Sequence, residues 1–426
     1  MDKRHPSPSF PPARWTWGLW ALATGFYLVA FYNRVAPAVI TSELMREFAI
    51  GAAALGNLSA VYFYTYVVMQ IPAGVLLDRF GPRCVLSAGA LITAAGTWLF
   101  AEATDVYWAN AGRGVIGAAV GVSFVGVIAL SSRWFPRDRV SFATGMALLV
   151  GILGAIFGGA PLRWLVDRFE WRPVMLASAV LTLLLCAAMW TLIRDRPSMS
   201  GFRDYEGSPA RTDGSILAAL RDVGRVPSVW AVFVAQGGLT NITLTFAGLW
   251  GVPFLVAHYH MSTVDAAWIA SIMMIAMAAG GPLLALLSAR IGSARTVCVG
   301  VSALGLAAWL PIVFVPDLPR PVLIALLMST GFCSGALVVG IELARSLVPA
   351  RLAGTATGIA NMGAVLGPTV MQPMAGVVLD FMWDGAMVAG ARNYSFGAYQ
   401  AAFALMALWT ALAASLFLIT RRPKAV

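Results

Sequence analysis

Two arginines lie inside long apolar segments, where a permanent charge needs a specific partner. Arg34 stands in the run Tyr-Asn-Arg-Val-Ala-Pro-Ala at 32–38, and Arg113 begins the spacing Arg-x-x-x-Gly-x-x-x-Gly at 113–121. An arginine inside a membrane span costs about 2.5–3.5 kcal/mol on insertion scales, and its pKa is too high for it to lose its charge. Neither segment contains an acidic residue. The sequence therefore favours an anion as the partner, with backbone carbonyls, tyrosines, water or an interfacial position as the alternatives.

Polar side chains in other apolar segments could complete a binding site. Gln236, Thr240, Thr243 and Trp250 recur every three to four residues or a multiple of that spacing, so they share one face of a helix. Amides and phenols supply oriented hydrogen bonds to a polar solute, although hydrogen bonding between helices is an equal alternative for each of them. The predicted substrate-binding residues are Arg34, Arg113, Tyr32, Asn33, Tyr64, Gln236, Thr240, Asn241, Trp250 and Asn361.

The composition places these residues in a membrane protein. Of the 426 residues, 59% are hydrophobic and 11% are charged, whereas a soluble domain has roughly 25% charged residues. Apolar segments near 20 residues are long enough to cross the hydrocarbon core as helices, and no alternating pattern typical of barrel strands occurs. The sequence predicts an all-α protein with twelve spans, at 17–40, 54–77, 84–103, 107–130, 143–162, 174–193, 228–257, 266–288, 297–316, 321–341, 355–379 and 396–419.

The charges indicate how the spans are oriented. The net charge of +10 resides mainly in short connectors, so it indicates membrane topology and not nucleic-acid binding. With alternate connectors assigned to opposite sides, the side of the termini carries 21 Lys and Arg and the other side 6. The positive-inside rule then places both termini in the cytoplasm. The longest connector, 194–227, separates two predicted six-helix domains at 1–193 and 228–426.

Nothing in the sequence indicates a cofactor or a metal site. The four cysteines lie in or beside apolar segments, so they form no disulfide framework, and zinc-ligand spacing is absent. No phosphate-binding glycine loop that ends in Gly-Lys-Ser/Thr occurs, which argues against direct coupling to ATP. We expect no cofactor and no catalytic residues.

The two halves share a weak internal repeat. Residues 135–147 match residues 348–360 at an offset of 213, with Ala-Thr-Gly in common, and Arg-Phe-Gly at 79–81 echoes Arg-Ile-Gly at 290–292. Chance similarity between Ala- and Gly-rich helices is the alternative to duplication. Parallel repeats of six spans are typical of one class of secondary transporter.

The connector between the second and third spans carries a further motif. The stretch Gly-Val-Leu-Leu-Asp-Arg-Phe-Gly-Pro-Arg at 74–83 resembles the G-x-x-x-D-R-x-G-R-[KR] signature of the major facilitator superfamily, with Pro82 at the position of one arginine. The resemblance implies two pseudo-symmetric six-helix bundles that rock around a central site. It also implies a charge cluster that holds the cytoplasmic side closed in the outward-facing state. The predicted latch residues are Gly74, Asp78, Arg79, Gly81, Arg83 and Arg133. The alternative is that Arg79 and Arg83 serve only to set the orientation of the spans in the membrane.

The stretch 32–38 is also similar to the Tyr-x-Asp-Arg segment of the organic anion:cation symporter branch. There the arginine binds a substrate carboxylate and the aspartate takes the coupling proton. Here Asn33 occupies the aspartate position, and an asparagine cannot titrate. The resemblance implies secondary transport of a small polar solute, anionic or carboxylate-bearing, with Arg34 as its ligand.

A proton-coupled exporter of drugs or metabolites is the main alternative. The fifth span contains Gly145, Gly154, Gly158 and Gly159, which partly resemble the antiporter signature of the family, and helix packing is the simpler interpretation of them. An integral-membrane enzyme or a scaffold fits less well, because clustered catalytic side chains and a soluble domain are absent. We expect a monomer in a bacterial inner membrane whose partners are lipid, a small-molecule substrate and a coupling proton or other ion, with no nucleic acid.

Overall fold

The computed structural model describes residues 9–205, 221–349 and 352–420. Within these residues the elements are helices joined by short turns and loops, together with one small hairpin in which β1 (Met387–Val388) pairs antiparallel with β2 (Ala391–Arg392). Eleven helical segments are long and apolar enough to cross a membrane. The predicted all-α membrane fold is confirmed.

The helices follow the predicted spans closely. Before the longest connector lie α1 (Ala13–Val35), η1 (Ala36–Val39), α2 (Thr41–Glu47), α3 (Ala52–Ala101), α4 (Val106–Val120), α5 (Ser123–Trp134), α6 (Arg137–Phe157), α7 (Ala160–Phe169) and α8 (Trp171–Leu192), and the 3₁₀ turn η2 (Pro197–Ser200) begins that connector. After it lie α10 (Pro227–Thr245), the π-helical turn η3 (Phe246–Trp250), α11 (Gly251–Tyr259), α12 (Thr263–Ile291), α13 (Ala294–Phe314), α14 (Arg320–Ser334), α15 (Leu337–Ser346), α16 (Ala353–Phe381) and α17 (Phe396–Ile419).

Several spans differ in detail from continuous helices. The fourth, fifth, seventh and tenth spans are each built from two helices that meet at a short irregular turn, as α4 and α5 do. The second and third spans are joined within α3, whose path is broken at Gly81, where φ is +78°. The first predicted span coincides with α1 and η1. Helix α1, whose last turn contains the polar residues Asn33 and Arg34, is not among the eleven apolar segments.

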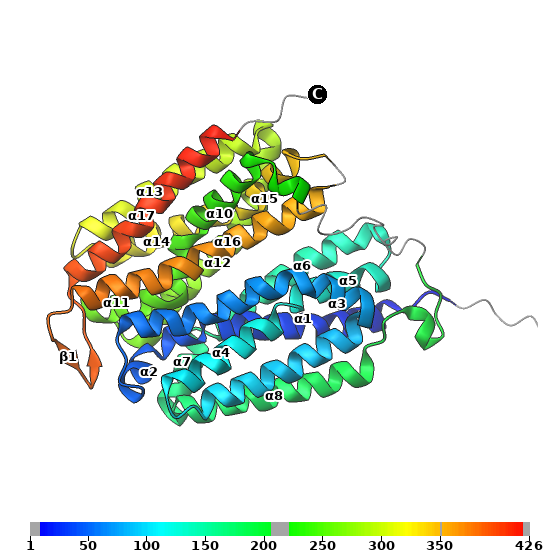
Figure 1. The fold of residues 1–426 in the computed structure, drawn as a ribbon, viewed down its shortest axis with the longest axis horizontal. Coiled ribbons are helices and arrows are strands. Elements are labelled where there is room, and N and C mark those ends of the chain that lie inside the picture. The colour runs from blue at the N-terminus through cyan, green and yellow to red at the C-terminus, as the bar shows by residue number, and fades with distance from the viewer. Residues whose placement is uncertain (1–8, 206–220, 350–351, 421–426) are drawn as a thin grey trace, which may run out of the picture.

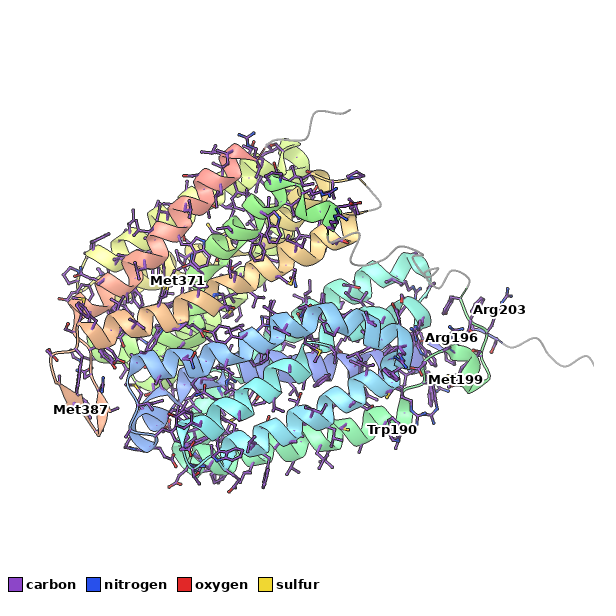
Figure 2. The ribbon with its side chains drawn as sticks, in the orientation of Figure 1. Trp190, Arg196, Met199, Arg203, Met371 and Met387 are labelled. Atoms are coloured by element: carbon purple, nitrogen blue, oxygen red, sulfur yellow. The ribbon has the colours of Figure 1, made fainter. Side chains whose placement is uncertain are left out.

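Figure 1 shows the helices in two groups, one on each side of the connector in sequence. The groups meet where α3 runs beside α16, close to the end of the molecule that carries the hairpin, and they diverge toward the end that carries η2 and the last turn of α17. We call these ends the hairpin end and the linker end. In Figure 2, Met387 marks the hairpin end, whereas Trp190, Arg196 and Arg203 mark the linker end.

The outer surface of the helices is apolar, as a bilayer requires. Leu181 and Leu184 on α8 and Leu408 on α17 are among many large aliphatic side chains that are exposed. Exposed apolar area on this scale is not found on monomeric proteins in water. Because residues 206–220 lie outside the described residues, part of the predicted linker 194–227 is not described, and the boundaries of the two domains stay predictions.

Candidate functional site

Arg34 lies in the last turn of α1 and is surrounded by aromatic rings. Its side chain is 8% exposed, and its guanidinium carbon lies 4.3 Å from the ring centre of Phe31, 5.4 Å from Tyr66 and 5.7 Å from Phe63. Phe31 precedes it by three positions and so lies on the same helix face, while the other two rings come from α3. Cation–π attraction favours this arrangement.

The aromatic rings do not neutralise this charge. Among the described residues, no carboxylate lies within 4.0 Å of Arg34, and its Nε is buried without a hydrogen-bond partner. A buried cation without an anion is unfavourable unless a ligand supplies one. Arg34 therefore has the properties of an anion-binding group.

Arg113 on α4 is buried even more completely, at 2% exposed, but it has hydrogen-bond partners. Its Nη1 donates to the carbonyl of Asn33 at 2.6 Å, and its other nitrogens donate to the carbonyls of Leu58 and Ser59 at 3.4 and 3.5 Å. The Asn33 carbonyl is free to accept from Arg113 because Pro37, four residues on, has no N–H that could bond to it within the helix. Arg113 thus ties the end of α1 to α3 and α4.

The two residues before Arg34 face other partners. The hydroxyl oxygens of Tyr32 and of Ser178 on α8 lie 2.8 Å apart, so Tyr32 bonds within the first group of helices. Asn33 donates from Nδ2 to the carbonyl of Val29 at 3.0 Å, and its Oδ1 is buried without a partner. Successive helical positions point about 100° apart, which separates Tyr32 from the surroundings of Arg34.

The tyrosines of α3 divide between two sides of the helix. Tyr62 and Tyr66 are four residues apart, are buried, and lie within 6.0 Å of the Arg34 guanidinium, whereas Tyr64 is 40% exposed. Tyr62 also donates to the carbonyl of Ala30 at 2.8 Å. The sequence interpretation selected Tyr64; the i, i+4 spacing of the other two tyrosines is the signal that indicates a shared face.

The predicted polar residues of the second half bond mainly to backbone carbonyls of neighbouring helices. Gln236 donates to the carbonyl of Leu337, Thr240 to that of Ala364, and Trp250 to that of Gln372. Asn241 donates to the hydroxyl of Thr410 at 3.1 Å, and Asn361 is half-buried on α16. Among the described residues, no hydrogen bond or ion pair joins this group to Arg34. The amide oxygens of Gln236, Asn241 and Gln372 are buried without partners.

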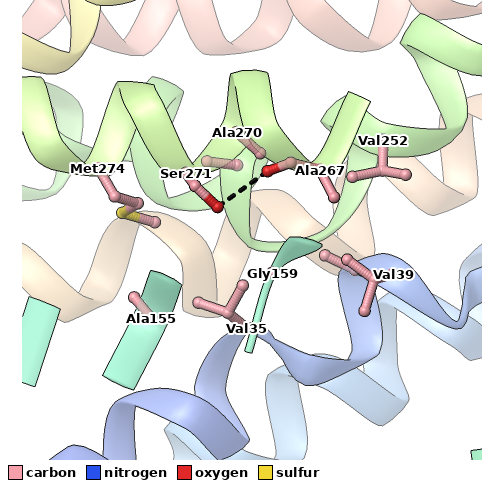
Figure 3. A pocket seen from close by; sticks show the side chains of 11 residues that line it. Val35, Val39, Ala155, Gly159, Val252, Ala267, Ala270, Ser271 and Met274 are labelled. Atoms are coloured by element: carbon pink, nitrogen blue, oxygen red, sulfur yellow. Dashed lines mark hydrogen bonds between the residues drawn. The ribbon is translucent and has the colours of Figure 1, made fainter. Parts of the chain in front are cut away.

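The two groups of helices pack tightly just beyond Arg34 toward the hairpin end. Figure 3 shows a narrow gap between them that is lined by small and apolar side chains, among them Val35, Val39, Ala155, Ala270 and Met274. The one hydroxyl that it labels, on Ser271, donates to the carbonyl of Ala267 in its own helix. A solute that reached Arg34 from the hairpin end would have to separate these surfaces.

The predicted latch residues lie at the linker end. Gly81 has a positive φ, and a Cβ there would lie 2.5 Å from the carboxylate of Asp195. The same carboxylate accepts from the backbone N–H of Arg83 at 2.8 Å, and Arg133 lies within electrostatic range of Asp195 and Asp78. Asp195, which the sequence interpretation did not select, therefore organises this turn within the first half.

The remaining predicted latch residues make fewer contacts. The guanidinium of Arg79 lies 5.3 Å from the ring centre of Phe80, and the Arg83 side chain donates to the carbonyl of Trp190. Gly74 has open space where a Cβ would lie. Of the described hydrogen bonds and ion pairs, none links this cluster to the second half.

A multi-pass helical membrane protein with two groups of helices, and a buried arginine that has no ion-pair partner among the described residues, has the architecture of a secondary transporter. Comparison with known families agrees: residues 20–254 and 239–426 match the Major Facilitator Superfamily, and the chain belongs to it. It is accordingly a transporter and not an enzyme.

Relatives within the superfamily include transporters named for organic acids. The chain is 24% identical over 376 residues to a "Putative tartrate transporter" of Agrobacterium vitis, with 81% of this chain and 80% of that protein covered. It is 24% identical over 278 residues to the "Probable galactarate/D-glucarate transporter GarP" of Escherichia coli K12, which covers 60% of this chain and 62% of that one.

Among solved structures, the chain resembles a bacterial homologue of the human lysosomal transporter Spinster. The TM-score is 0.75 at 16% identity, with 97% of this chain and 100% of the other covered. At this level of identity the similarity shows the fold.

Proposed function

We propose that this transporter carries a small polar solute that bears a carboxylate, and that Arg34 binds this carboxylate. The observation that carries the proposal is the Arg34 guanidinium itself, buried among Phe31, Phe63 and Tyr66 with no carboxylate within 4.0 Å in the described part of the chain. An arginine pairs with a carboxylate through two parallel hydrogen bonds, and the low dielectric of the site strengthens that attraction.

The names of two relatives support this class of substrate. Tartrate, galactarate and glucarate are hydroxylated dicarboxylates, and the proteins named for them share about a quarter of their aligned residues with this chain. Hydroxyl groups on such a solute would suit the phenols and amides that the sequence interpretation assigned to the site.

Alternating access is the mechanism that this architecture supports. The ribbons of the halves lie together toward the hairpin end and diverge toward the linker end (Figure 1), from which we infer an arrangement open at the linker end. We infer from the excess of basic residues that the linker end is cytoplasmic and that the structure is inward-facing in a bacterial inner membrane. In this state the predicted latch residues make no hydrogen bond or ion pair to the second half within the part of the chain that the structure describes, as expected of a latch that forms only when the cytoplasmic side closes.

The test is a thermal-shift titration of the purified protein in detergent with tartrate and galactarate. A ligand present at 100 times its Kd stabilises the folded state by about 2.7 kcal/mol, so a specific carboxylate raises the unfolding temperature. Threitol and galactitol, which have hydroxyls but no carboxylates, serve as matched neutral probes and should have no effect.

A pair of variants assigns the binding to Arg34. Arg34→Gln should abolish the shift, and Arg290→Gln, at an exposed arginine of the linker end, should retain it. An undiminished carboxylate response in Arg34→Gln would overturn the proposal.

Proton-coupled export remains the second candidate function, and the glycines of α6 bear on it. A Cβ at Gly154 would lie 2.1 Å from the carbonyl of Leu28, and one at Gly158 would lie 2.7 Å from that of Tyr32, so both allow α6 to pack on α1. Close packing accounts for these two positions without an exchange mechanism. Accumulation of hydrophobic cations in cells that express the protein, compared with cells that lack it, separates export from carboxylate uptake.

A further inference from the structure

The carboxylate of Asp380 joins the two halves of the molecule at the hairpin end. Asp380 lies in the last turn of α16, and its Oδ1 and Oδ2 accept hydrogen bonds from the backbone N–H groups of Ala52 and Ala53 at 3.0 and 2.9 Å. These two N–H groups begin α3, more than 320 residues earlier in the chain. A side chain of the second half therefore caps a helix of the first half.

Helix α3 has no cap of its own. The residue before its first turn is Gly51, which has no side chain, and no side-chain cap bond forms there. The first N–H groups of a helix have no partner within the helix, and they form the positive end of its dipole. An ionised carboxylate is the side chain best suited to this position, and Asp380 supplies it only while α3 and α16 are together.

Two neighbours hold the Asp380 carboxylate in place. Arg392 donates from Nη1 to Oδ1 at 3.0 Å, and the Tyr394 hydroxyl donates to the same oxygen at 2.7 Å. The Tyr394 hydroxyl also accepts from the N–H of Ala52 at 3.0 Å. Burial and the adjacent negative charge raise the pKa of Tyr394, which keeps its hydroxyl protonated as a donor. We name Asp380, Arg392 and Tyr394 the Asp380 clamp.

The backbones of α3 and α16 approach closely beside the clamp. A Cβ on Gly376 would lie 2.2 Å from the carbonyl of Ala52, and a Cβ on Gly56 would lie 2.5 Å from the carbonyl of Gln372. The hairpin that carries Arg392 also extends the contact, because β2 packs against α2 and Gly390 approaches the Arg46 side chain. The clamp thus lies within a continuous contact between the halves.

We propose that the Asp380 clamp is the gate that holds the hairpin end closed, and that it must release the start of α3 each time this end opens. Opening separates α16 from α3, which leaves the N–H groups of Ala52 and Ala53 without their acceptor. The hydrogen bonds therefore stabilise the closed arrangement selectively, and a ligand or contact can shift a two-state equilibrium only through such a difference. The inference rests on the proposed alternating-access cycle and is independent of the substrate class.

The experiment measures the distance across the hairpin end by pulsed electron paramagnetic resonance in lipid nanodiscs. Spin labels are placed on Thr104→Cys and Pro316→Cys, two exposed positions at this end in different halves, after the four native cysteines have been replaced. In the parent protein a single short distance should dominate. Asp380→Ala should raise the ratio of long to short distances roughly tenfold, which corresponds to about 1.4 kcal/mol.

The matched control is Asp384→Asn, because Asp384 lies four residues on but accepts only from the N–H of Ala386 in its own loop. It should leave the distances unchanged. Asp380→Asn keeps one acceptor oxygen and should give an intermediate ratio of long to short distances. Tyr394→Phe should do the same. If Asp380→Ala does not fold, these two variants decide whether the clamp holds the hairpin end closed.

The proposal is overturned if the Asp380 and Tyr394 variants show the parent distribution, or if Asp384→Asn shifts it equally. Because no substrate is added, neither result depends on whether Arg34 binds a carboxylate. The gate and the binding site can therefore fail separately.

Discussion

Arg34 and Arg113 are the same residue type, buried in the same half of the protein and packed on the same tyrosine, yet they have opposite surroundings. Both guanidinium carbons lie within about 6 Å of the Tyr62 ring centre, at 6.0 Å for Arg34 and 4.9 Å for Arg113. Arg113 donates to three backbone carbonyls, whereas the Nε of Arg34 has no hydrogen-bond partner.

The difference shows how one buried cation can stabilise a fold while its neighbour remains available to a ligand. Arg113 supplies the donor that the carbonyl of Asn33, at the end of α1, lacks, and it adds a second donor to the carbonyls of Leu58 and Ser59 inside α3. It thereby fixes the helix turn that presents Arg34. Arg34 is surrounded by aromatic rings, which attract a cation, and its Nε has no hydrogen-bond partner.

The largest expected effect is that of Arg113→Met on stability. The variant leaves the carbonyls of Asn33, Leu58 and Ser59 without the donor, and hydrogen bonds to a charged group contribute about 1.5–3 kcal/mol each. We expect the free energy of unfolding to fall by about 3 kcal/mol or more, with a low yield of monodisperse protein. Denaturant unfolding followed by circular dichroism measures it, and wild-type stability would remove the structural role of Arg113.

Gly117→Ala should disturb the surroundings of Arg113 without altering any charge. A Cβ at Gly117 would lie 2.1 Å from the carbonyl of Tyr62, so α4 must move away from α3. Overpacking of this kind costs about 1–3 kcal/mol. Gly114→Ala is the matched control in the same helix, because its Cβ would lie 3.3 Å from the nearest side-chain atom. Equal loss of stability in both variants would contradict the prediction.

Phe31→Leu removes the ring nearest to Arg34. Because its ring centre lies 4.3 Å from the guanidinium carbon, we expect a loss of about 1 kcal/mol of stability beyond the cost of the smaller side chain. Phe124→Leu, at a half-buried phenylalanine whose ring centre lies 5.0 Å from that of Tyr27, measures the cost of the smaller side chain alone. Thermal unfolding of the two variants gives the difference, and no difference would indicate that the rings do not stabilise the Arg34 cation.

Arg34→Met should have the smallest effect on stability, in direct contrast to Arg113→Met. It removes a charge that lacks an ion-pair partner and leaves an apolar side chain among aromatic rings, and such replacements are often neutral or stabilising. We expect a change of less than about 1 kcal/mol in the same denaturant assay. A loss as large as that of Arg113→Met would mean that the two arginines do not differ in role.

Much of the fold could be predicted from the sequence because a membrane span depends on local composition. The predicted span 396–419 coincides with α17 (Phe396–Ile419), and the burial of Arg34 and Arg113 is observed. The site was less predictable. Tyr64 was selected although Tyr62 and Tyr66 face Arg34, since the rotation of α3 about its axis depends on its neighbours.

Asp380 illustrates the same limit over a longer range. The predicted span 355–379 ends one residue before it, and nothing in its local sequence indicates that its partners are Ala52 and Ala53. Asp195 likewise acts on the turn at Gly81 from more than a hundred residues away.

The sequence by itself determined that the chain spans a membrane as a set of helices, that it resembles one superfamily of transporters, and that two arginines lie within its spans. The physical reason is that transfer from water to lipid depends on the composition of each segment of about 20 residues. Only the tertiary structure decided which arginine is satisfied by carbonyls, which tyrosines face the other, and which carboxylate joins the halves. Those outcomes depend on the rotation and contact of helices that are far apart in the chain, because hydrogen bonds form only within about 3 Å.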